Sequence, residues 1–235
     1  MVAIPQHLYL GFIALALGLW VLLAWRFSRV GAKSVAVFFL GWMVISALLS
    51  MRGVLGQWKT VPPPMLIVFL VQIFGVIWLA TLSPWKNRLA KIPQPWLVGI
   101  QAFRIPTELL MAGLATASLL PPEMTFHGYN FDVVTGLCSV ILACALNRKG
   151  SSGFRTYLIL FNVLGLTLLF IVAGMGALSA PTLFQPLHIS INNIHIARFP
   201  LVWLPTFLVP TALLLHLISL RKLSRQRADV KHPIP

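Results

Sequence analysis

Charged residues are scarce in this chain. Only 9% of its 235 residues are charged and 58% are hydrophobic, and the mean hydropathy is +0.89. A soluble domain carries about 25% charged residues. The composition therefore predicts a membrane protein, and no polar stretch is long enough to form a separate soluble domain.

Acidic residues are the scarcest of all, with 4 Asp and Glu against 18 Lys and Arg and a net charge of +14. In a soluble protein this excess would indicate nucleic-acid binding. Here the bases lie in short segments between apolar runs, which is the distribution that membrane topology produces. We therefore expect a lipid bilayer as the partner, and no nucleic acid.

The sequence also lacks the motifs of familiar catalytic and cofactor sites. GxSxG, HExxH and P-loop patterns are absent. The last apolar run has no lysine to anchor retinal, and a haem pair would need two facing membrane histidines, of which only His216 is present. Cys138 and Cys144 are ~600° apart on a helix, on different faces, so we interpret them as packing residues. The sequence leaves open whether the chain is an enzyme.

Seven apolar runs approach the ~20 residues that a membrane-spanning helix needs. They are Leu8–Trp25, Ser34–Met51, Met65–Leu82, Trp96–Leu120, Asp132–Asn147, Phe154–Leu178 and Phe199–Leu220. The predicted fold is all-α, a seven-helix membrane bundle over residues 1–220 that is followed by a basic tail over residues 221–235.

The loops between the runs predict an orientation. Fourteen of the 18 bases lie in the first, third and fifth loops and in the tail, and three lie on the other side. Because basic loops stay on the cytoplasmic side, we expect the N-terminus outside and the C-terminus in the cytoplasm. The first run has no basic segment before it and no cleavage site after it, which indicates a retained anchor. The tail is expected to rest on anionic lipid headgroups.

The stretch "QAFRIPTELL" places two ionisable residues inside the fourth run. Gln101, Arg104 and Glu108 recur at spacings of three and four, so they share one helix face. Counting ~1.5 Å per residue from Trp96 places Arg104 ~12 Å deep and Glu108 ~18 Å deep. We expect the two charges to form an intrahelical ion pair. Pro106 cannot donate a backbone hydrogen bond, so we expect it to bend the helix there.

Polar residues of other runs lie at comparable depths. The same count places Gln72 ~16 Å, Asn162 ~12 Å and His216 ~6 Å from the cytoplasmic end. Ionisable residues in a membrane usually face a cavity or a bundle interior, whereas single polar residues commonly join helices. One hypothesis is a ligand pocket, and the other is a buried ion pair that only sets helix packing. The predicted ligand-binding residues are Gln101, Arg104, Glu108, Gln72 and Asn162.

Two outer loops carry a second group of polar residues. The fourth loop, Pro121–Asp132, holds half of all the acids, and Asn130 or Asp132 is suited to cap the helix that follows. The expected outer-face cluster is His127, Asn130, Asp132, His188 and His195. A metal site is an open alternative. Its candidate ligands are His127, His188, His195 and Glu123.

The sixth loop, "HISINNIHIAR", alternates apolar and polar residues around Asn192 and Asn193. Asn tolerates left-handed backbone conformations, so the pair predicts a two-residue hairpin turn. In that register Ile191 faces Ile194, and Ile189 faces Ile196, on one apolar side. We therefore expect a β-hairpin near residues 187–198 that covers the outer mouth of the bundle.

The patterns Q-x-x-R-x-x-x-E and M-T-F-x-G-x-N-x-D, followed by a polar Asn in the next-to-last run, carry a resemblance. The matching positions are Gln101, Arg104 and Glu108; Met124, Thr125, Phe126, Gly128, Asn130 and Asp132; and Asn162. Over its C-terminal two thirds the chain resembles a group of bacterial multi-pass inner-membrane proteins with no assigned activity. The resemblance implies a bacterial inner membrane, and it implies no reaction or cofactor.

Three hypotheses about function follow from the sequence. The leading one is binding of a small molecule in a polar intramembrane pocket, for sensing or transport. The alternative is a membrane-embedded enzyme with a His and carboxylate metal site on the periplasmic face. The third is a non-catalytic partner subunit.

Overall fold

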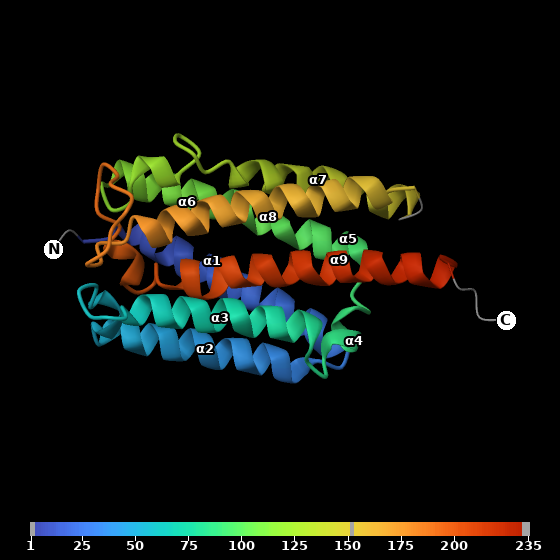
Figure 1. Ribbon diagram of the computed structural model, residues 1–235. Helices are drawn as coiled ribbons and strands as arrows, with labels where there is room; N and C mark the ends of the chain where they lie inside the picture. Colours follow the sequence, from blue (N-terminus) through green and yellow to red (C-terminus); the bar gives the residue numbers. More distant parts are fainter. Residues whose placement is uncertain (1–2, 151–152, 232–235) are drawn as a thin grey trace.

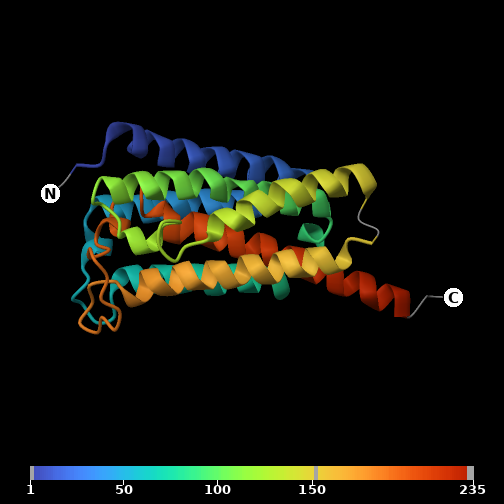
Figure 2. The same ribbon diagram turned by 90° about the horizontal axis from the view of Figure 1, so that it is seen from above.

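The computed structural model describes residues 3–150 and 153–231, and long helices run side by side through it (Figures 1 and 2). No strand occurs in these two ranges, so the all-α class is confirmed. The α-helices that build the bundle are α1 (Gln6–Arg29), α2 (Lys33–Met51), α3 (Pro64–Thr81), α5 (Gln94–Gly99), α6 (Arg104–Thr116), α7 (Asp132–Lys149), α8 (Arg155–Leu178) and α9 (Val209–Lys231). The short elements are α4 (Lys86–Leu89), the 3-10 turns η1 (Val54–Gly56), η2 (Ile100–Phe103), η3 (Pro122–Met124) and η4 (His195–Ala197), and the π-helix η5 (Leu204–Leu208).

Six helical segments of the described chain are long and apolar enough to cross a membrane. They are Gln6–Arg29, Lys33–Met51, Pro64–Thr81, Gln94–Thr116, Arg155–Leu178 and Leu204–Arg225. The fourth of them joins α5, η2 and α6 into one helical rod. The predicted run 132–147 is the one that does not qualify, although it forms the 18-residue helix α7, which packs against α5, α6 and α8.

The helix α9 is the centre of the bundle. In the most apolar 18-residue stretch of its span Leu204–Arg225, 72% of the residues are buried, whereas 28% to 44% are buried in the matching stretch of each other span. It contacts α3, α5 and α8 (Figure 1). A helix that is apolar on all sides is stable only inside a core or a membrane, and α9 packs in the core.

The outward surface of the bundle is apolar. Large side chains such as Phe74, Ile141 and Phe170 are more than 60% exposed. A soluble monomer rarely exposes extended apolar surface. The arrangement fits a surface that faces lipid, as the composition predicts for a membrane protein.

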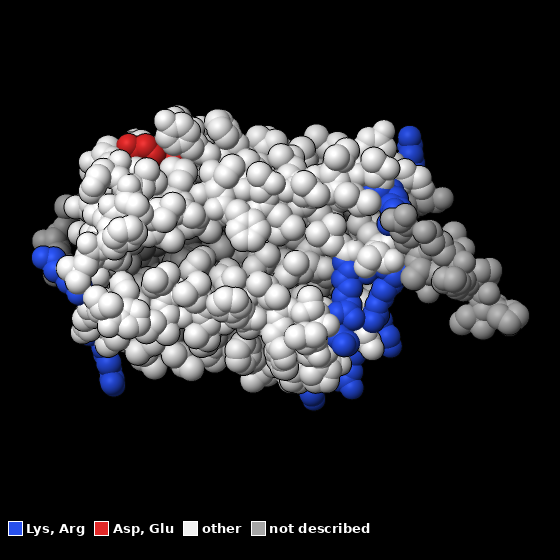
Figure 3. All heavy atoms as spheres, in the orientation of Figure 1, with Lys and Arg blue, Asp and Glu red and all other residues white. Residues whose placement is uncertain are grey.

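Basic side chains gather at one end of the bundle (Figure 3). Several of them donate hydrogen bonds to backbone carbonyl groups at helix ends or in the loop between α4 and α5. Arg221 Nη1 bonds the carbonyl oxygens of Ala80 and Thr81 at 2.7 and 2.9 Å, and Lys222 Nζ bonds that of Ile92 at 2.8 Å. The last carbonyl groups of a helix lack partners within the helix and carry partial negative charge, so these bases join the helices at this end. Within the predicted basic tail, residues 221–231 continue α9, and residues 232–235 lie outside the described residues.

The predicted β-hairpin near residues 187–198 is wrong. This segment is irregular and ends in the turn η4. Ile196 is buried at 8% exposure while Ile194 is 43% exposed, so the two do not share an apolar side. Ser50 Oγ of α2 donates to the carbonyl of Ala197 at 2.7 Å. An isolated two-stranded hairpin is only marginally stable, and here the segment packs on the bundle instead of pairing with itself.

The bonds of Arg221 generate a prediction about stability. Arg221→Ala removes both hydrogen bonds to the end of α3 and should lower the free energy of unfolding by about 1–2 kcal/mol. Thermal unfolding of the detergent-solubilised protein measures this. Lys33→Ala, a matched loss of charge at an exposed position, is the control. Equal melting temperatures for the two variants would contradict the role assigned to Arg221.

Candidate functional site

The side chain of Arg104 lies at the centre of a buried polar cluster, with 2% of its surface exposed. Arg104 begins α6, directly after the 3-10 segment η2. Pro106 follows two residues later and cannot donate a backbone hydrogen bond. The proline interrupts the backbone hydrogen bonds of the α-helix, and the helix takes the 3-10 form at η2, next to this interruption. The 3-10 turn brings Gln101 and Arg104 close together.

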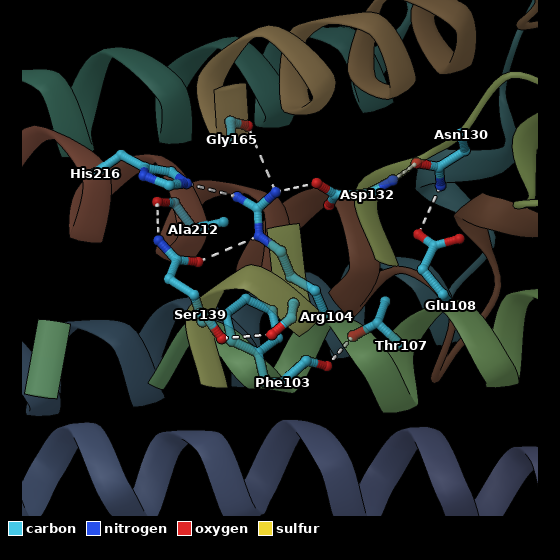
Figure 4. Close-up of polar contacts among 12 residues, drawn as sticks. Phe103, Arg104, Thr107, Glu108, Asn130, Asp132, Ser139, Gly165, Ala212 and His216 are labelled. Carbon is cyan, nitrogen blue, oxygen red and sulfur yellow. Dashed lines mark hydrogen bonds and ion pairs between the residues drawn. The ribbon is translucent and has the colours of Figure 1, made fainter. Parts of the chain in front are cut away.

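Four elements supply partners to the Arg104 guanidinium (Figure 4). Its Nε donates to Oε1 of Gln101 in η2 at 3.2 Å, and its Nη1 donates to Oδ1 of Asp132 in α7. Nη1 also lies 3.5 Å from the carbonyl oxygen of Gly165 in α8, and Nη2 lies 3.1 Å from Nε2 of His216 in α9. The fixed fork of an arginine suits this arrangement.

The expected ion pair between Arg104 and Glu108 is wrong, because Arg104 pairs with Asp132 instead. Asp132 is the first residue of α7, and its carboxylate accepts from Arg104 at this end of the helix. Asn130 serves that end, since its Oδ1 accepts the backbone N–H of Asp132 at 3.1 Å. A buried cation needs a close counter-ion, and one from a neighbouring helix reaches the guanidinium here.

His216 extends the cluster toward the basic end of the bundle. Arginine has donors only, so His216 Nε2 accepts from Arg104 and Nδ1 carries the proton. That proton is donated to Oδ1 of Asn162 at 2.9 Å. Asn162 Nδ2 then donates to Ser219 Oγ at 2.8 Å, and Gln94 Nε2 donates to the same oxygen at 2.8 Å. The resulting chain of contacts reaches from Asp132 to Gln94.

Gly165 makes the approach of His216 possible. A Cβ added at Gly165 would lie 2.4 Å from Cε1 and Nε2 of the His216 ring. The ring cannot retreat without losing Arg104 or Asn162. The carbonyl oxygen of Gly165 also faces Arg104. A glycine is therefore required at this position for packing as well as for the polar contact.

Glu108 lies beside the cluster at its outer side. Its Oε1 accepts a hydrogen bond from Asn130 Nδ2 at 2.6 Å. Its Oε2 is buried and has no hydrogen-bond partner among the described residues. A cavity of about 40 Å³ is lined by the polar residues Arg104, Thr107, Glu108, Asn130 and Asp132 together with apolar side chains. A water needs roughly 10–15 Å³ of such space, so the cavity admits waters, while small-molecule pockets measure about 300–1,000 Å³.

The structure joins some of the predicted ligand-binding residues and leaves one apart. Gln101 contacts Arg104 directly, Asn162 reaches it through His216, and Glu108 reaches Asp132 through Asn130. Gln72 is buried on α3, and its Nε2 has no hydrogen-bond partner in the described parts of the chain. Sequence reasoning missed the parts played by Gln94, Gly165 and Ser219, and it left His216 out of the predicted ligand-binding residues.

The outer-face cluster assembles only in part, since Asn130 bonds Asp132 but no hydrogen bond between described residues joins this pair to the three histidines. His127 and His188 are exposed, and His195 is buried with its Nδ1 3.2 Å from Nη1 of Arg198. Burial, followed by the nearby charge of Arg198, lowers the pKa of His195, so it is a neutral acceptor. Within residues 3–150 and 153–231 no three His, Cys, Asp or Glu side chains form a group that could hold a metal ion.

Glu123 has another partner, the loop between α8 and η5. Its Oε2 accepts from the Ser190 hydroxyl at 2.8 Å, and its Oε1 accepts from the Ser190 backbone N–H at 3.1 Å. Burial alone would raise the pKa of the Glu123 carboxyl, but hydrogen bonds from its own backbone and from Ser190 outweigh this and hold the pKa below its usual value. The ionised carboxylate therefore ties this loop to the turn η3.

One family matches residues 62–224 of the chain, and its description is "Domain of unknown function (DUF8737)". The chain belongs to this family. The matched region begins just before α3 and contains the four residues whose hydrogen bonds to the Arg104 guanidinium are described above. It excludes α1 and α2. No curated protein and no solved structure matches the chain.

The close approach at Gly165 yields a second prediction. Gly165→Ala should displace the His216 ring and lower the free energy of unfolding by about 2–3 kcal/mol, the usual cost of overpacking a core. Gly174→Ala, on the same helix with no atom within 4 Å of the added Cβ, should have little effect. Thermal unfolding of both variants in detergent makes the comparison. Equal losses would show that helix flexibility, and not the His216 contact, explains the glycine.

The Glu123 tie yields a third prediction, about pH. Because the folded-state pKa is lowered, the tie contributes fully above the usual pKa of a glutamate, near 4.3. It is lost as the pH falls through the lower folded-state value. The protection of residues 181–194 against hydrogen exchange, measured relative to the intrinsic exchange rate at each pH, should therefore fall in acid in the native protein. In Glu123→Gln this protection should already be lower at neutral pH and should change less in acid, and an unchanged acid response in that variant would contradict this assignment.

Proposed function

We propose that this chain is a seven-helix protein of the bacterial inner membrane that binds a small molecule together with a proton, for sensing or transport. The observation that carries the proposal is Glu108, a buried carboxyl group with one oxygen unpartnered among the described residues, on a water-sized cavity. Ionisable groups inside a membrane are costly and usually mark functional sites. Glu108 is the group whose proton would be exchanged.

The proposed topology rests on two observations. The basic side chains gather at one end of the bundle (Figure 3), and the described chain begins and ends at opposite ends of it (Figure 1). An odd number of spans produces the second arrangement, and α7 would be the additional span. The basic end would face the cytoplasm, where it would contact anionic lipid headgroups.

The charge balance of the cluster supports a proton on Glu108. Arg104 supplies one positive charge and Asp132 supplies the matching negative charge. His216 accepts from Arg104, so it is neutral. An ionised Glu108 would add a second negative charge without a second cation. In a medium of low dielectric constant that state is costly, so the neutral form is favoured and a change in the surroundings can release the proton.

Arg104 was predicted from the sequence to bind a ligand, but its guanidinium is poorly suited to hold an anionic one. Four of its five N–H groups point at Gln101, Asp132, Gly165 or His216. An incoming anion would have to displace Asp132 from a site too small to receive it. We therefore assign Arg104 to hold Asp132 and His216 in place, and Glu108 to exchange the proton.

The test is infrared difference spectroscopy of the protein in proteoliposomes during a pH titration. We expect the carbonyl stretch of a protonated carboxyl group at neutral pH, and its disappearance in Glu108→Gln. Glutamine can still accept from Asn130, so the fold should persist. Glu123→Gln, which changes an acid outside the cluster, should keep the band. A band that survives Glu108→Gln, or no band in the native protein, would refute the proton-binding role.

A further inference from the structure

A larger cavity of about 420 Å³ lies between α3 and α8, in the half of the bundle that also holds Glu108. The hollow is visible between these helices in the space-filling view (Figure 3). Both α3 and α8 pack against α9, and Leu204, Pro205 and Val209 of the η5–α9 segment line the cavity between them. The small residues Ala173 and Gly176 of α8 leave the space open. Its volume lies within the range of ligand pockets.

The lining of this cavity is almost entirely apolar. No Asp, Glu, Lys, Arg or His of the described chain lines it. The hydroxyl groups of Thr60 and Thr182 already donate to the loop carbonyl oxygens of Gln57 and Phe184. A charged ligand group would therefore be buried without a counter-ion, which is costly.

Asn193 is the exception in the lining. Its side chain is 1% exposed, it lines the cavity, and neither Oδ1 nor Nδ2 has a hydrogen-bond partner among the described residues. Leaving a buried amide unpaired costs about 1–3 kcal/mol per group. A ligand group that both accepts from Nδ2 and donates to Oδ1 would remove this cost. A hydroxyl group does both.

The rim of the cavity is apolar and exposed. Val61, Leu178, Leu183 and Phe184 line it and are 50% to 83% exposed. Exposed apolar patches mark surfaces that contact membranes or other apolar partners. The cavity lies at the end of the bundle opposite the basic end, so its mouth would open toward the outer leaflet of the bilayer.

We infer that this cavity binds an uncharged, single-chain amphiphile that bears a hydroxyl group and enters from the outer leaflet. The hydroxyl group bonds the Asn193 amide, and the hydrocarbon chain lies along α3 and α8. Val172, Leu204 and Val209 line both this cavity and the small cavity of Glu108, so one layer of side chains separates the amphiphile from that carboxyl group. This inference rests on the proposed function, because it names the chemical class of the small molecule that the proposed function invokes.

The test is photolabelling of the full chain in lipid nanodiscs with octadecanol that carries a diazirine in its chain, followed by peptide mapping. We expect saturable labelling of α3, α8 and the loop 181–194. Ala173→Phe fills the cavity and should reduce this labelling at least tenfold. Gly174→Phe places the same side chain where no atom lies within 4 Å of the Cβ, outside the cavity lining, and should leave labelling unchanged.

Two further arms test the polar contact. Asn193→Leu should weaken octadecanol labelling about five- to tenfold, the ratio expected for one to two neutral hydrogen bonds. The matching photoreactive hydrocarbon, without a hydroxyl group, should label both proteins equally. Photoreactive stearate should label less than the alcohol at a pH where it is ionised. If Ala173→Phe does not fold, Ala177→Phe replaces it in the experiment, because Ala177 also lines the cavity on α8.

Labelling that spreads over the whole lipid-facing surface, or that neither substitution reduces, would overturn the inference. Labelling by ionised stearate that is stronger than labelling by octadecanol would overturn the claim that the ligand is uncharged. The Glu108 experiment reads carboxyl protonation and uses no ligand, so failure of one proposal is distinguishable from failure of the other. A Glu108→Gln protein that has lost its infrared band should still be labelled at the cavity.

Discussion

The burial of one guanidinium group is the constraint on which the arrangement of this bundle depends. An unpaired cation in a membrane interior is strongly unfavourable, and Arg104 is 2% exposed. Its partners come from η2, α7, α8 and α9 (Figure 4). Because each helix contributes a group at a fixed distance, the rotation and the axial position of all four elements are set together. Gly165 permits that approach, since any Cβ there would overlap the His216 ring.

The outer loop at residues 121–132 is held in place together with the buried Arg104 cluster. A Cβ on Gly128 would lie 2.4 Å from the Cα of Glu123, so the turn can close only around a glycine. This closure brings Asn130 into the bundle, where its amide bonds both Glu108 and the backbone of Asp132. The loop thereby holds the two carboxyl groups apart, one on Arg104 and one on the small cavity. The same turn presents Glu123 to Ser190, which links the buried cluster to the loop that covers the larger cavity.

The sequence predicted the helices well, because apolar runs of this length have few other stable states in a membrane. It also predicted that Gln101 and Arg104 share a face. It could not give the rotation of one helix against another, so it paired Arg104 with Glu108 instead of Asp132. It left His216 out of the predicted ligand-binding residues, although Nε2 of His216 lies 3.1 Å from Nη2 of Arg104. The alternation in "HISINNIHIAR" indicated a hairpin, but contacts with the bundle, such as that of Ser50 with Ala197, decided the conformation.

The two cavities give a physical reason why ligand binding and proton binding would be coupled under the proposals above. Leu204 begins a π-helical turn, a rare feature that is frequent at functional sites, and its side chain lines both cavities. An amphiphile in the larger cavity would press on this shared wall and exclude water from the side of Glu108. A drier environment favours the neutral carboxyl group. Linkage is reciprocal, so a protonated Glu108 would tighten amphiphile binding by the same factor by which the amphiphile favours protonation.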